Sequence, residues 1–379
     1  MPLVLTEEQE LLRDAARDFV NDQCAIDSLR QLRDERTDAG FDPKLWKEMA
    51  ELGWLGIPFP EELGGAGLGQ AEIGVVLEEL GRRLAVTPFL STILLGGGAI
   101  LEAGTEAQKS SVLPGVCRGD TILALAHQET PRHAPYVVAM TASAEGEEFI
   151  LNGRKTLVVD GASADQLVVV ARTSGASGER LGLSLFLVDA ASPGIARNRT
   201  FLIDSRSAAN IDFEGVRVGA DSVIGTVDRG ADALDPVLDR AAAALSAEML
   251  GGIEEAFART LAYLKEREQF GARIGSFQGL KHRAARWFCE VELSRSIVMK
   301  TLRAQDEKAA EAPGLTSACK ARVSDTFRLS GEEGIQMHGG VGVTDEEDIG
   351  FFMKRARVSE LLLGDATFHR NRFAELREY

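Results

Sequence analysis

Two short segments of the chain combine residue types that suit binding of a phosphorylated nucleotide. The first segment, 266–282, places Arg267 and Gln269 ahead of several glycines and the pair Phe277-Gln278. The second is Gln-Met-His-Gly-Gly at 336–340. An arginine offers fixed donors for pyrophosphate oxygens. Adjacent glycines let backbone N–H groups approach a phosphate or an adenine ring.

Arg267 by itself is equally typical of a solvated charge at a helix end. The combination with the second segment favours a cofactor site over that alternative. His338 alone is more often a packed or surface histidine, so we assign it no catalytic role, and the sequence suggests no metal site. Both segments resemble the acyl-CoA dehydrogenase family, and the resemblance implies as cofactor-binding residues Arg267, Gln269, Phe277, Gln278, Gln336, Met337, His338, Gly339 and Gly340.

The elements that carry these segments differ along the chain. From Thr6 to about Cys117 the hydrophobic period is helical, and Thr6 to Gln9 has the pattern of a capping box. Further helices are predicted at 43–52, 71–84 and 92–103, with a Gly- and Pro-rich loop at 53–69. The first domain, 1–120, is therefore expected to be helical.

The middle of the chain, 121–232, has short β-branched and aliphatic runs between turn residues. Turn signals stand at 152–153 and 160–161. The pattern predicts a small antiparallel sandwich or barrel. The predicted strands are 121–126, 148–151, 166–172, 183–188 and 211–216.

The last part, 233–379, returns to Ala- and Leu-rich helical segments, with breaks at 313–314 and 339–342. We predict a C-terminal four-helix bundle there. The fold class is accordingly α+β, with helical domains on both sides of a β domain.

Composition limits the possible partners. With 379 residues of which 45% are hydrophobic, the chain can form two or three domains with a sizeable core. A net charge of −16 argues against nucleic acid and anionic membrane as partners. The four cysteines lack paired spacing, which favours reduced thiols. We expect a cytoplasmic protein with neither a signal peptide nor a spanning helix.

The order of helical, β and helical thirds resembles the acyl-CoA dehydrogenase family over the whole chain. Besides the two segments above, Pro60–Gly65 and Lys354–Ala356 are similar to landmarks of that family. The resemblance implies a tetrameric flavoprotein that holds FAD and oxidises an acyl-CoA, in fatty acid or sterol side-chain metabolism. It also implies that 267–278 and 336–340 reach the FAD bound in a neighbouring subunit.

The middle domain departs from the family pattern. The family's Thr-Glu-Pro-x-Ala-Gly-Ser-Asp loop, which binds flavin, is replaced at 127–133, and its Gly-Ser is missing. In the family's Lys-x-Trp-Ile-Thr-Asn-Gly element, Leu157 stands for the aromatic shield and Val159 for the threonine. Losing one such contact costs on the order of 1 kcal/mol. We therefore expect this chain's own β domain to bind flavin weakly or not at all.

The resemblance also implies a glutamate that removes the α-proton of the thioester. Its usual position is occupied here by Leu363, and the family's alternative position by Ala241. Asp365, Asp239 and Glu248 are near enough in sequence to be substitutes, and Asp365 is the best of them. An aspartate that begins a helix after Gly364 is at least as good an interpretation of Asp365.

Intact cofactor segments together with a missing base are similar to one subunit type of heteromeric acyl-CoA dehydrogenases, including the small subunit of pimeloyl-CoA-type enzymes. The implied partners are an acyl-CoA, a second dehydrogenase subunit in an α2β2 tetramer or a further copy of the chain, and an electron-transferring flavoprotein. The alternative function is a non-catalytic scaffold that has lost flavin. Another flavin reaction, such as oxidation by O₂, also remains open.

Overall fold

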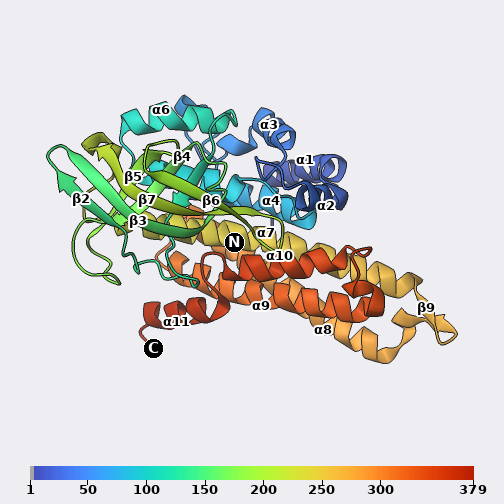
Figure 1. Ribbon diagram of the computed structural model, residues 1–379. Helices are drawn as coiled ribbons and strands as arrows, with labels where there is room; N and C mark the ends of the chain where they lie inside the picture. Colours follow the sequence, from blue (N-terminus) through green and yellow to red (C-terminus); the bar gives the residue numbers. More distant parts are fainter. Residues whose placement is uncertain (1–3) are drawn as a thin grey trace. The chain divides into compact units, whose positions relative to one another are not determined.

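The computed structural model describes residues 4–379, which form two compact units. The first unit comprises the described residues up to Gln31, with Gln70–Ala85 and Ala242–Tyr379. The second comprises Leu32–Gly69 and Val86–Ala241. Figure 1 shows the first as helices and the second as a sheet with further helices. The helical, β and helical order predicted from the sequence is confirmed.

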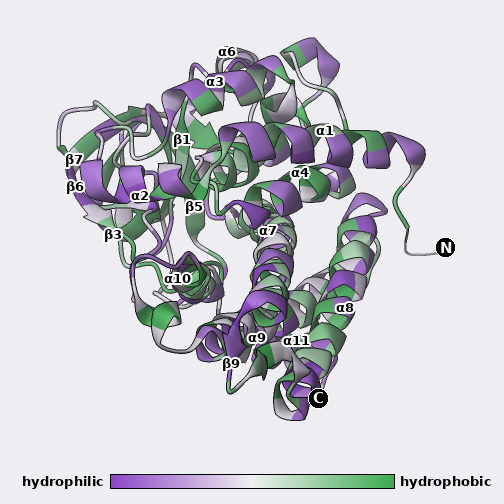
Figure 2. Cartoon of the chain, turned by 90° about the vertical axis from the view of Figure 1, so that its right-hand side faces the viewer, coloured by the Kyte–Doolittle hydropathy of each residue, from purple (hydrophilic) through white to green (hydrophobic). Residues whose placement is uncertain are grey.

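The first unit is built from amphipathic helices, and its N-terminal one begins as predicted. Thr6 accepts from the Gln9 backbone N–H at 3.2 Å, and the Gln9 side chain accepts from the Thr6 N–H, which is a complete capping box. The exposed turns of α1 are mostly hydrophilic in Figure 2. The helices of the first unit are α1 (Glu7–Gln23), α4 (Gln70–Arg82), α7 (Ala231–Glu266, which belongs to this unit from Ala242 onward), α8 (Gln278–Asp306), α9 (Ala312–His338), α10 (Ile349–Leu361) and α11 (Ala366–Leu376). A further helix, α2 (Ile26–Glu35), begins in this unit.

Helices α4 and α7 approach closely enough to exclude side chains at their contact. A Cβ on Gly81 would overlap the Glu248 carbonyl oxygen, and a Cβ on Gly251 would overlap the Glu78 carbonyl oxygen. Glycine at both positions lets the two backbones touch. The predicted helix at 71–84 is thus confirmed, with its observed end at Arg82.

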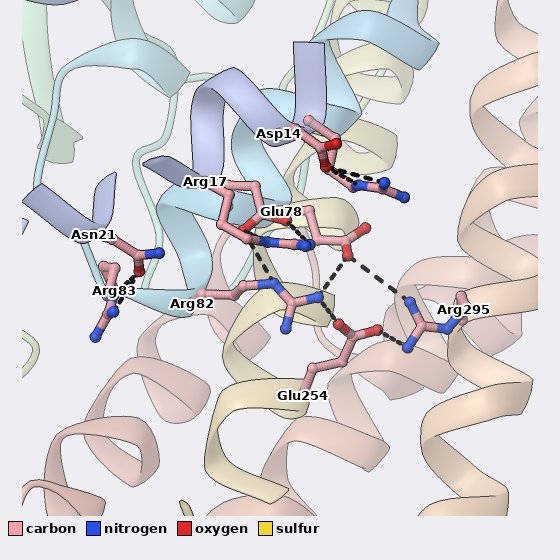
Figure 3. Close-up of polar contacts among 10 residues, drawn as sticks. Asp14, Arg17, Asn21, Glu78, Arg82, Arg83, Glu254 and Arg295 are labelled. Carbon is pink, nitrogen blue, oxygen red and sulfur yellow. Dashed lines mark hydrogen bonds and ion pairs between the residues drawn. The ribbon is translucent and has the colours of Figure 1, made fainter. Parts of the chain in front are cut away.

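An ion network around two buried carboxylates joins α1, α4, α7 and α8 in this unit (Figure 3). Arg82 lies between Glu79, at 3.3 Å, and Glu254. Arg17 pairs with Glu79 at 2.8 Å, and Arg295 pairs with Glu254. Burial raises the pKa of Glu254 to about 7, against the two guanidinium groups that favour its ionised form. The carboxylates of Glu79 and Glu254 are thus paired with arginines of this unit.

The second unit begins with helices and tight turns. The predicted helix at 43–52 is confirmed as α3 (Pro43–Glu51), and the predicted loop at 53–69 contains two short 3₁₀ turns. The helix predicted at 92–103 starts instead as a π-helix, Phe89–Gly97, followed by α5 (Gly98–Ala103). Thr92 in the π-helix bonds both the N–H and the C=O of Leu123 through its hydroxyl, at 3.2 Å each. The helix α6 (Glu106–Cys117) follows.

The sheet of this unit has eight strands in the order β6-β7-β3-β2-β4-β5-β8, with β1 paired to β4. Most strand pairs are antiparallel as predicted. Strand β1 runs parallel to β4, and β2 also makes a parallel bridge to β4. The strands are β1 (Leu123–Ala126), β2 (Thr141–Glu145), β3 (Glu148–Val159), β4 (Gln166–Arg172), β5 (Leu183–Asp189), β6 (Ile195–Phe201), β7 (Ser207–Gly219) and β8 (Val223–Ile224).

The turn predicted at 152–153 is wrong, because β3 continues through it. Gly153 stands at a register shift against β7, and Asn152 accepts from the Gly215 N–H at 2.8 Å. A Cβ on Gly153, with φ at +146°, would lie 2.8 Å from Met140. Asn-Gly here forms a β-bulge instead of a hairpin turn. Throughout 4–379, no helix has the length and apolar character that crossing a membrane requires.

Candidate functional site

Of the predicted cofactor residues, Arg267 and Gln269 lie at a small hairpin beyond the end of α7, and Phe277 and Gln278 lie where α8 begins (Figure 1). Strands β9 (Glu268–Gln269) and β10 (Ala272–Arg273) pair there, and the tip residues Phe270 and Gly271 both have positive φ. Such a two-residue tip matches the twist of a hairpin. The hairpin closes on α7 because the Ile274 N–H donates to the Arg267 carbonyl at 2.8 Å. Arg267, Gln269, Phe277 and Gln278 are all exposed.

The second predicted segment ends α9 at the same end of the helical unit. Tyr263, in the last turns of α7, stacks on His338 with ring centres 4.4 Å apart and donates to its carbonyl at 3.2 Å. Arg267 is one turn beyond Tyr263, since its N–H donates to the Tyr263 carbonyl. The structure therefore brings the ends of α7 and α9, and with them both segments, to one place.

The side chains of the second segment divide into two groups. Met337 and His338 are buried, and His338 Nδ1 lies 2.7 Å from the Gly334 carbonyl, so these two pack within the unit. Gln336, Gly339 and Gly340 are exposed. A Cβ on Gly340 would meet no atom of this chain within 4 Å. The open space suits a group from outside the chain that approaches the backbone closely.

The loop at 127–140 in the second unit uses its own polar groups internally. The Glu129 carboxylate accepts from the N–H groups of Ala139, at 2.6 Å, and Met140, at 3.1 Å. Buried Lys155 donates to Glu129 at 2.6 Å and to the His127 carbonyl at 3.1 Å. Burial lowers the pKa of Lys155 to about 8 and that of His127 to about 4. The N–H groups of Ala139 and Met140 therefore donate to Glu129 and do not point outward to a phosphate.

The position of the family's aromatic shield is a strained bulge in β3. Leu157 has φ at +50° where the pairing with β7 shifts between Lys155 and Val158, and its side chain is 38% exposed. Its N–H donates to the Asn210 side chain at 3.1 Å. A non-glycine residue in this conformation is uncommon and costs energy. The backbone presents residue 157 outward, but a leucine offers no aromatic ring there.

Asp365, the predicted base, is the N-cap residue of α11 (Ala366–Leu376). Its carboxylate accepts from the Phe368 N–H at 2.8 Å and begins α11. The helix-start interpretation is therefore what the structure contains, and any role as a base stays a prediction. Leu363, at the family's usual glutamate position, is half-buried with φ at +58°.

The other two substitutes are buried in helix α7. Glu248 pairs with Arg355 at 3.0 Å, and both side chains are almost fully enclosed. Asp239 is 7% exposed, and Ala241 is fully buried. None of these positions presents an exposed carboxylate.

Matches to three family models identify the family to which the chain belongs. Models of the acyl-CoA dehydrogenase N-terminal, middle and C-terminal domains match residues 6–120, 126–216 and 228–376. The chain belongs to the acyl-CoA dehydrogenase family. It is thus a member of a family of oxidoreductases, whose enzymes use FAD to oxidise acyl-CoA thioesters.

Relatives match this acyl-CoA dehydrogenase chain over nearly its full length. The probable acyl-CoA dehydrogenase YngJ of Bacillus subtilis is 28% identical, with 98% of each chain covered. A structure described as a variant of the Tcur3481-Tcur3483 steroid ACAD is 31% identical, with a TM-score of 0.88 and 98% of each chain covered. The ChsE4-ChsE5 complex of Mycobacterium tuberculosis is 27% identical over 100% of each chain, with a TM-score of 0.89.

The exposed end of the first unit fits a portion of FAD in this acyl-CoA dehydrogenase, whereas the loop at 127–140 fits it poorly. In the first case Arg267, Gln269 and Gln336 are exposed, and a Cβ on Gly340 would meet no atom of this chain within 4 Å. In the second, the Ala139 and Met140 amides are already bound by Glu129. The roles of the nine predicted residues remain predictions.

Three buried residues that hold loops within the two units were not predicted from the sequence. Lys155, Lys320 and His369 are buried, and each bonds a backbone carbonyl of a loop. One sequence feature could have indicated such a residue: a lysine among small residues on a helix face that is otherwise packed, as at Lys320 between Cys319 and Ser324. A buried charge needs such partners, so the placement implies a structural task.

Proposed function

We propose that this chain is the subunit of a heteromeric FAD-dependent acyl-CoA dehydrogenase that completes the flavin site of its partner and lacks the usual glutamate. One contrast carries the proposal. The exposed donors around Arg267 and Gly340 have open space beside them, while Glu129 binds the amides of the chain's own loop. A chain built this way can contribute to a flavin held elsewhere better than it can hold one.

In this family FAD, when bound, accepts the β-hydride of the acyl thioester. The residues of this chain supply binding and orientation. Arg267 would donate to the pyrophosphate, and Gln269 and Gln336 would add amide donors at the same end. The leucine side chain at 363 cannot accept a proton, so the α-proton would be transferred to a carboxylate of the partner.

Two structural relatives support a proposal for the substrate class. The structural relative at 31% identity is a variant of the Tcur3481-Tcur3483 steroid ACAD, and another relative is the ChsE4-ChsE5 complex. These support a bulky acyl-CoA, such as a sterol side-chain intermediate, and a second dehydrogenase subunit. An electron-transferring flavoprotein would receive the electrons. The net charge of −16 and the sparse cysteines favour a cytoplasmic location.

The flavin-to-protein ratio tests the proposal. The chain would be purified alone and after co-expression with a neighbouring dehydrogenase-like reading frame, and flavin would be measured by its visible absorbance. We expect colour only in the complex, at one flavin per pair. One flavin per chain in the protein purified alone would contradict the proposal, and a colourless complex would favour the non-catalytic scaffold.

Two arginines of the same hairpin give a matched comparison within the complex. R267M should lower the flavin content, because it removes the donors for the pyrophosphate. R273M should not, since Arg273 is an exposed arginine whose nearest charged partner is Glu268 at 3.9 Å. Equal flavin content in both variants would remove Arg267 from the flavin site.

A further inference from the structure

The turn between α9 and α10 is anchored to α7 where it begins. His338, the last residue of α9, stacks on Tyr263 of α7 with ring centres 4.4 Å apart and planes at 25°. The Tyr263 hydroxyl donates to the His338 carbonyl at 3.2 Å. Nδ1 of the same imidazole lies 2.7 Å from the Gly334 carbonyl. The start of the turn is therefore held by an aromatic contact and two hydrogen bonds.

A second anchor holds the other end of the turn. Asp348 directly precedes α10, and its carboxylate accepts from Arg259 of α7 and from Arg30 of α2, each at 2.8 Å. This carboxylate makes no cap hydrogen bond to α10. The three side chains are between 19% and 27% exposed. Because these partly buried charges form one network, solvent and salt screen them less than an isolated surface pair.

Aromatic side chains of α10 pack against both arginines of this anchor. The Arg30 guanidinium lies over the Phe351 ring, 4.6 Å from its centre, and that of Arg259 lies over the Phe352 ring at 5.8 Å. Both rings are buried. A guanidinium on a ring face gains from cation–π attraction, while its N–H groups at the edge stay free to donate. The arginines thus contact Asp348 and the first turn of α10 together.

The two anchors and Arg267 follow one another along α7 at intervals of four residues. Arg259 and Tyr263 are one turn apart, and residues four apart lie on the same side of an α-helix. The Arg267 N–H donates to the Tyr263 carbonyl at 2.8 Å, which continues the helical spacing past the end of α7. One helix therefore places both Arg267 and the turn.

The backbone of the turn depends on two glycines. Gly339 has φ at +67° and ψ at −142°, a combination that glycine adopts far more readily than other residues. Gly342 is buried, and a Cβ there would lie 2.8 Å from the Ile335 carbonyl oxygen. The Thr344 N–H donates to the Val341 carbonyl at 3.0 Å. The glycines let the turn fold back onto α9 between its two anchors.

We propose that Arg259, Tyr263 and Asp348 are positioning residues for the open backbone at Gly339–Gly340. They fix the turn on α7 at one distance from Arg267, so that the backbone amides and the guanidinium meet a ligand without rearrangement. A site formed in advance loses less conformational entropy when its ligand binds. None of the three is among the nine predicted cofactor residues. The inference rests on the proposed function only for the identity of the ligand, the flavin nucleotide held by the partner.

Amide hydrogen exchange of the full chain alone, without flavin or partner, tests the anchors. Peptides that span 339–348 report the turn, where amides at both ends donate within the chain. In R259M and Y263L we expect these peptides to exchange at least about tenfold faster, because local opening no longer breaks the anchor contacts. Exchange in α11 should not change. R328M, which removes an exposed pair with Glu332 on α9, should leave the turn as it is in the parent.

Conservative variants separate positioning from a general loss of stability. R259K keeps a cation for Asp348, and Y263F keeps the ring that stacks on His338. We expect both variants to restore most of the protection of the turn. Folded R259M and Y263L proteins that exchange like the parent would overturn the anchors. Equal exchange in R259M and R259K would overturn the ion pair as the cause.

Flavin retention by the co-expressed complex tests the link between the turn and the ligand. After dilution of the complex, the fraction of flavin that remains bound measures its affinity. We expect about tenfold weaker binding in R259M complexes that assemble normally, and R259K complexes should resemble the parent. Retention like that of the parent in R259M, together with fast exchange in the turn, would overturn the link. A parent complex without flavin would contradict the proposed function, and exchange in the chain alone would still decide whether the anchors hold the turn.

Discussion

Arg355 of α10 donates to Glu248 of α7 across 3.0 Å in the interior of the helical unit. The same guanidinium donates to the Leu84 carbonyl at 3.1 Å, beyond the end of α4. One arginine therefore joins three helices, and it does so through a carboxylate that lies two turns from the family's alternative base position. The engagement of Glu248 in this pair explains why we do not assign it to proton transfer.

Removing one partner of this pair should strongly destabilise the chain. R355M would leave the Glu248 carboxylate buried without its cation, and we expect a loss of about 3–5 kcal/mol in the free energy of unfolding. Chemical denaturation measures that loss. R357M removes an exposed arginine that pairs with Glu360, and it should change stability by about 1 kcal/mol or less.

E248Q separates the structural role from a catalytic one. Glutamine keeps an acceptor for Arg355, so the protein should fold and turnover of the complex should change little. A loss of several orders of magnitude in a folded E248Q complex would make Glu248 the base.

Asp365 can be tested in the same way because asparagine and aspartate cap helices equally well. D365A should lose about 0.5–2 kcal/mol in the free energy of unfolding, since the Phe368 N–H loses its acceptor. D365N should retain the stability of the parent. If D365N also retains turnover in the complex, Asp365 is a cap only, and a large loss of turnover would assign it to proton transfer.

Much of the fold follows from local pattern in the sequence. The capping box at Thr6 and the runs at 166–172 and 183–188 combine propensity with clear periodicity, and they form the predicted elements. The strands β2 and β6 were not predicted, because most of their residues are polar or exposed. Asn152-Gly153 was predicted as a turn because its bulge depends on the pairing with β7, which a local pattern does not contain.

The candidate site was predictable only where residue type alone carries the chemistry. Arginine beside glycines indicated a phosphate site, and the structure places those residues at one exposed end. The contacts of Lys320 with the Ser359 and Gly364 carbonyls join residues about forty positions apart. The sequence alone does not distinguish a buried lysine from an exposed one, so contacts of this kind are found only in the structure.

The buried His369 should make the chain less stable in acid. Its pKa is lowered to about 3 in the folded state from 6.5, so below pH 6.5 the unfolded state takes up a proton that the folded state refuses. Stability should therefore fall as the pH decreases from about 6.5 toward 3, by up to about 1.4 kcal/mol per pH unit from this group. H369Q should reduce that slope by one proton.

Denaturation midpoints measured between pH 4 and 8 check this expectation. His127, with a pKa lowered to about 4, contributes in the same direction and remains in H369Q, so the slope should decrease without vanishing. H282Q, at an exposed histidine, serves as the control and should keep the slope of the parent. An unchanged slope in H369Q would mean that His369 is protonated in the folded chain.

Two glycines in helices of the same unit should respond to alanine in opposite directions. Gly251 of α7 faces the Glu78 carbonyl so closely that a Cβ would overlap it, whereas a Cβ on Gly279 of α8 would meet nothing within 4 Å. G251A should cost about 1–3 kcal/mol or more, because α4 and α7 must separate. G279A should stabilise the chain by about 0.4–1 kcal/mol, since alanine restricts the unfolded chain at no steric cost. Thermal and chemical unfolding of both variants measure the two effects, and a G251A protein as stable as the parent would show that α4 and α7 do not touch at this glycine.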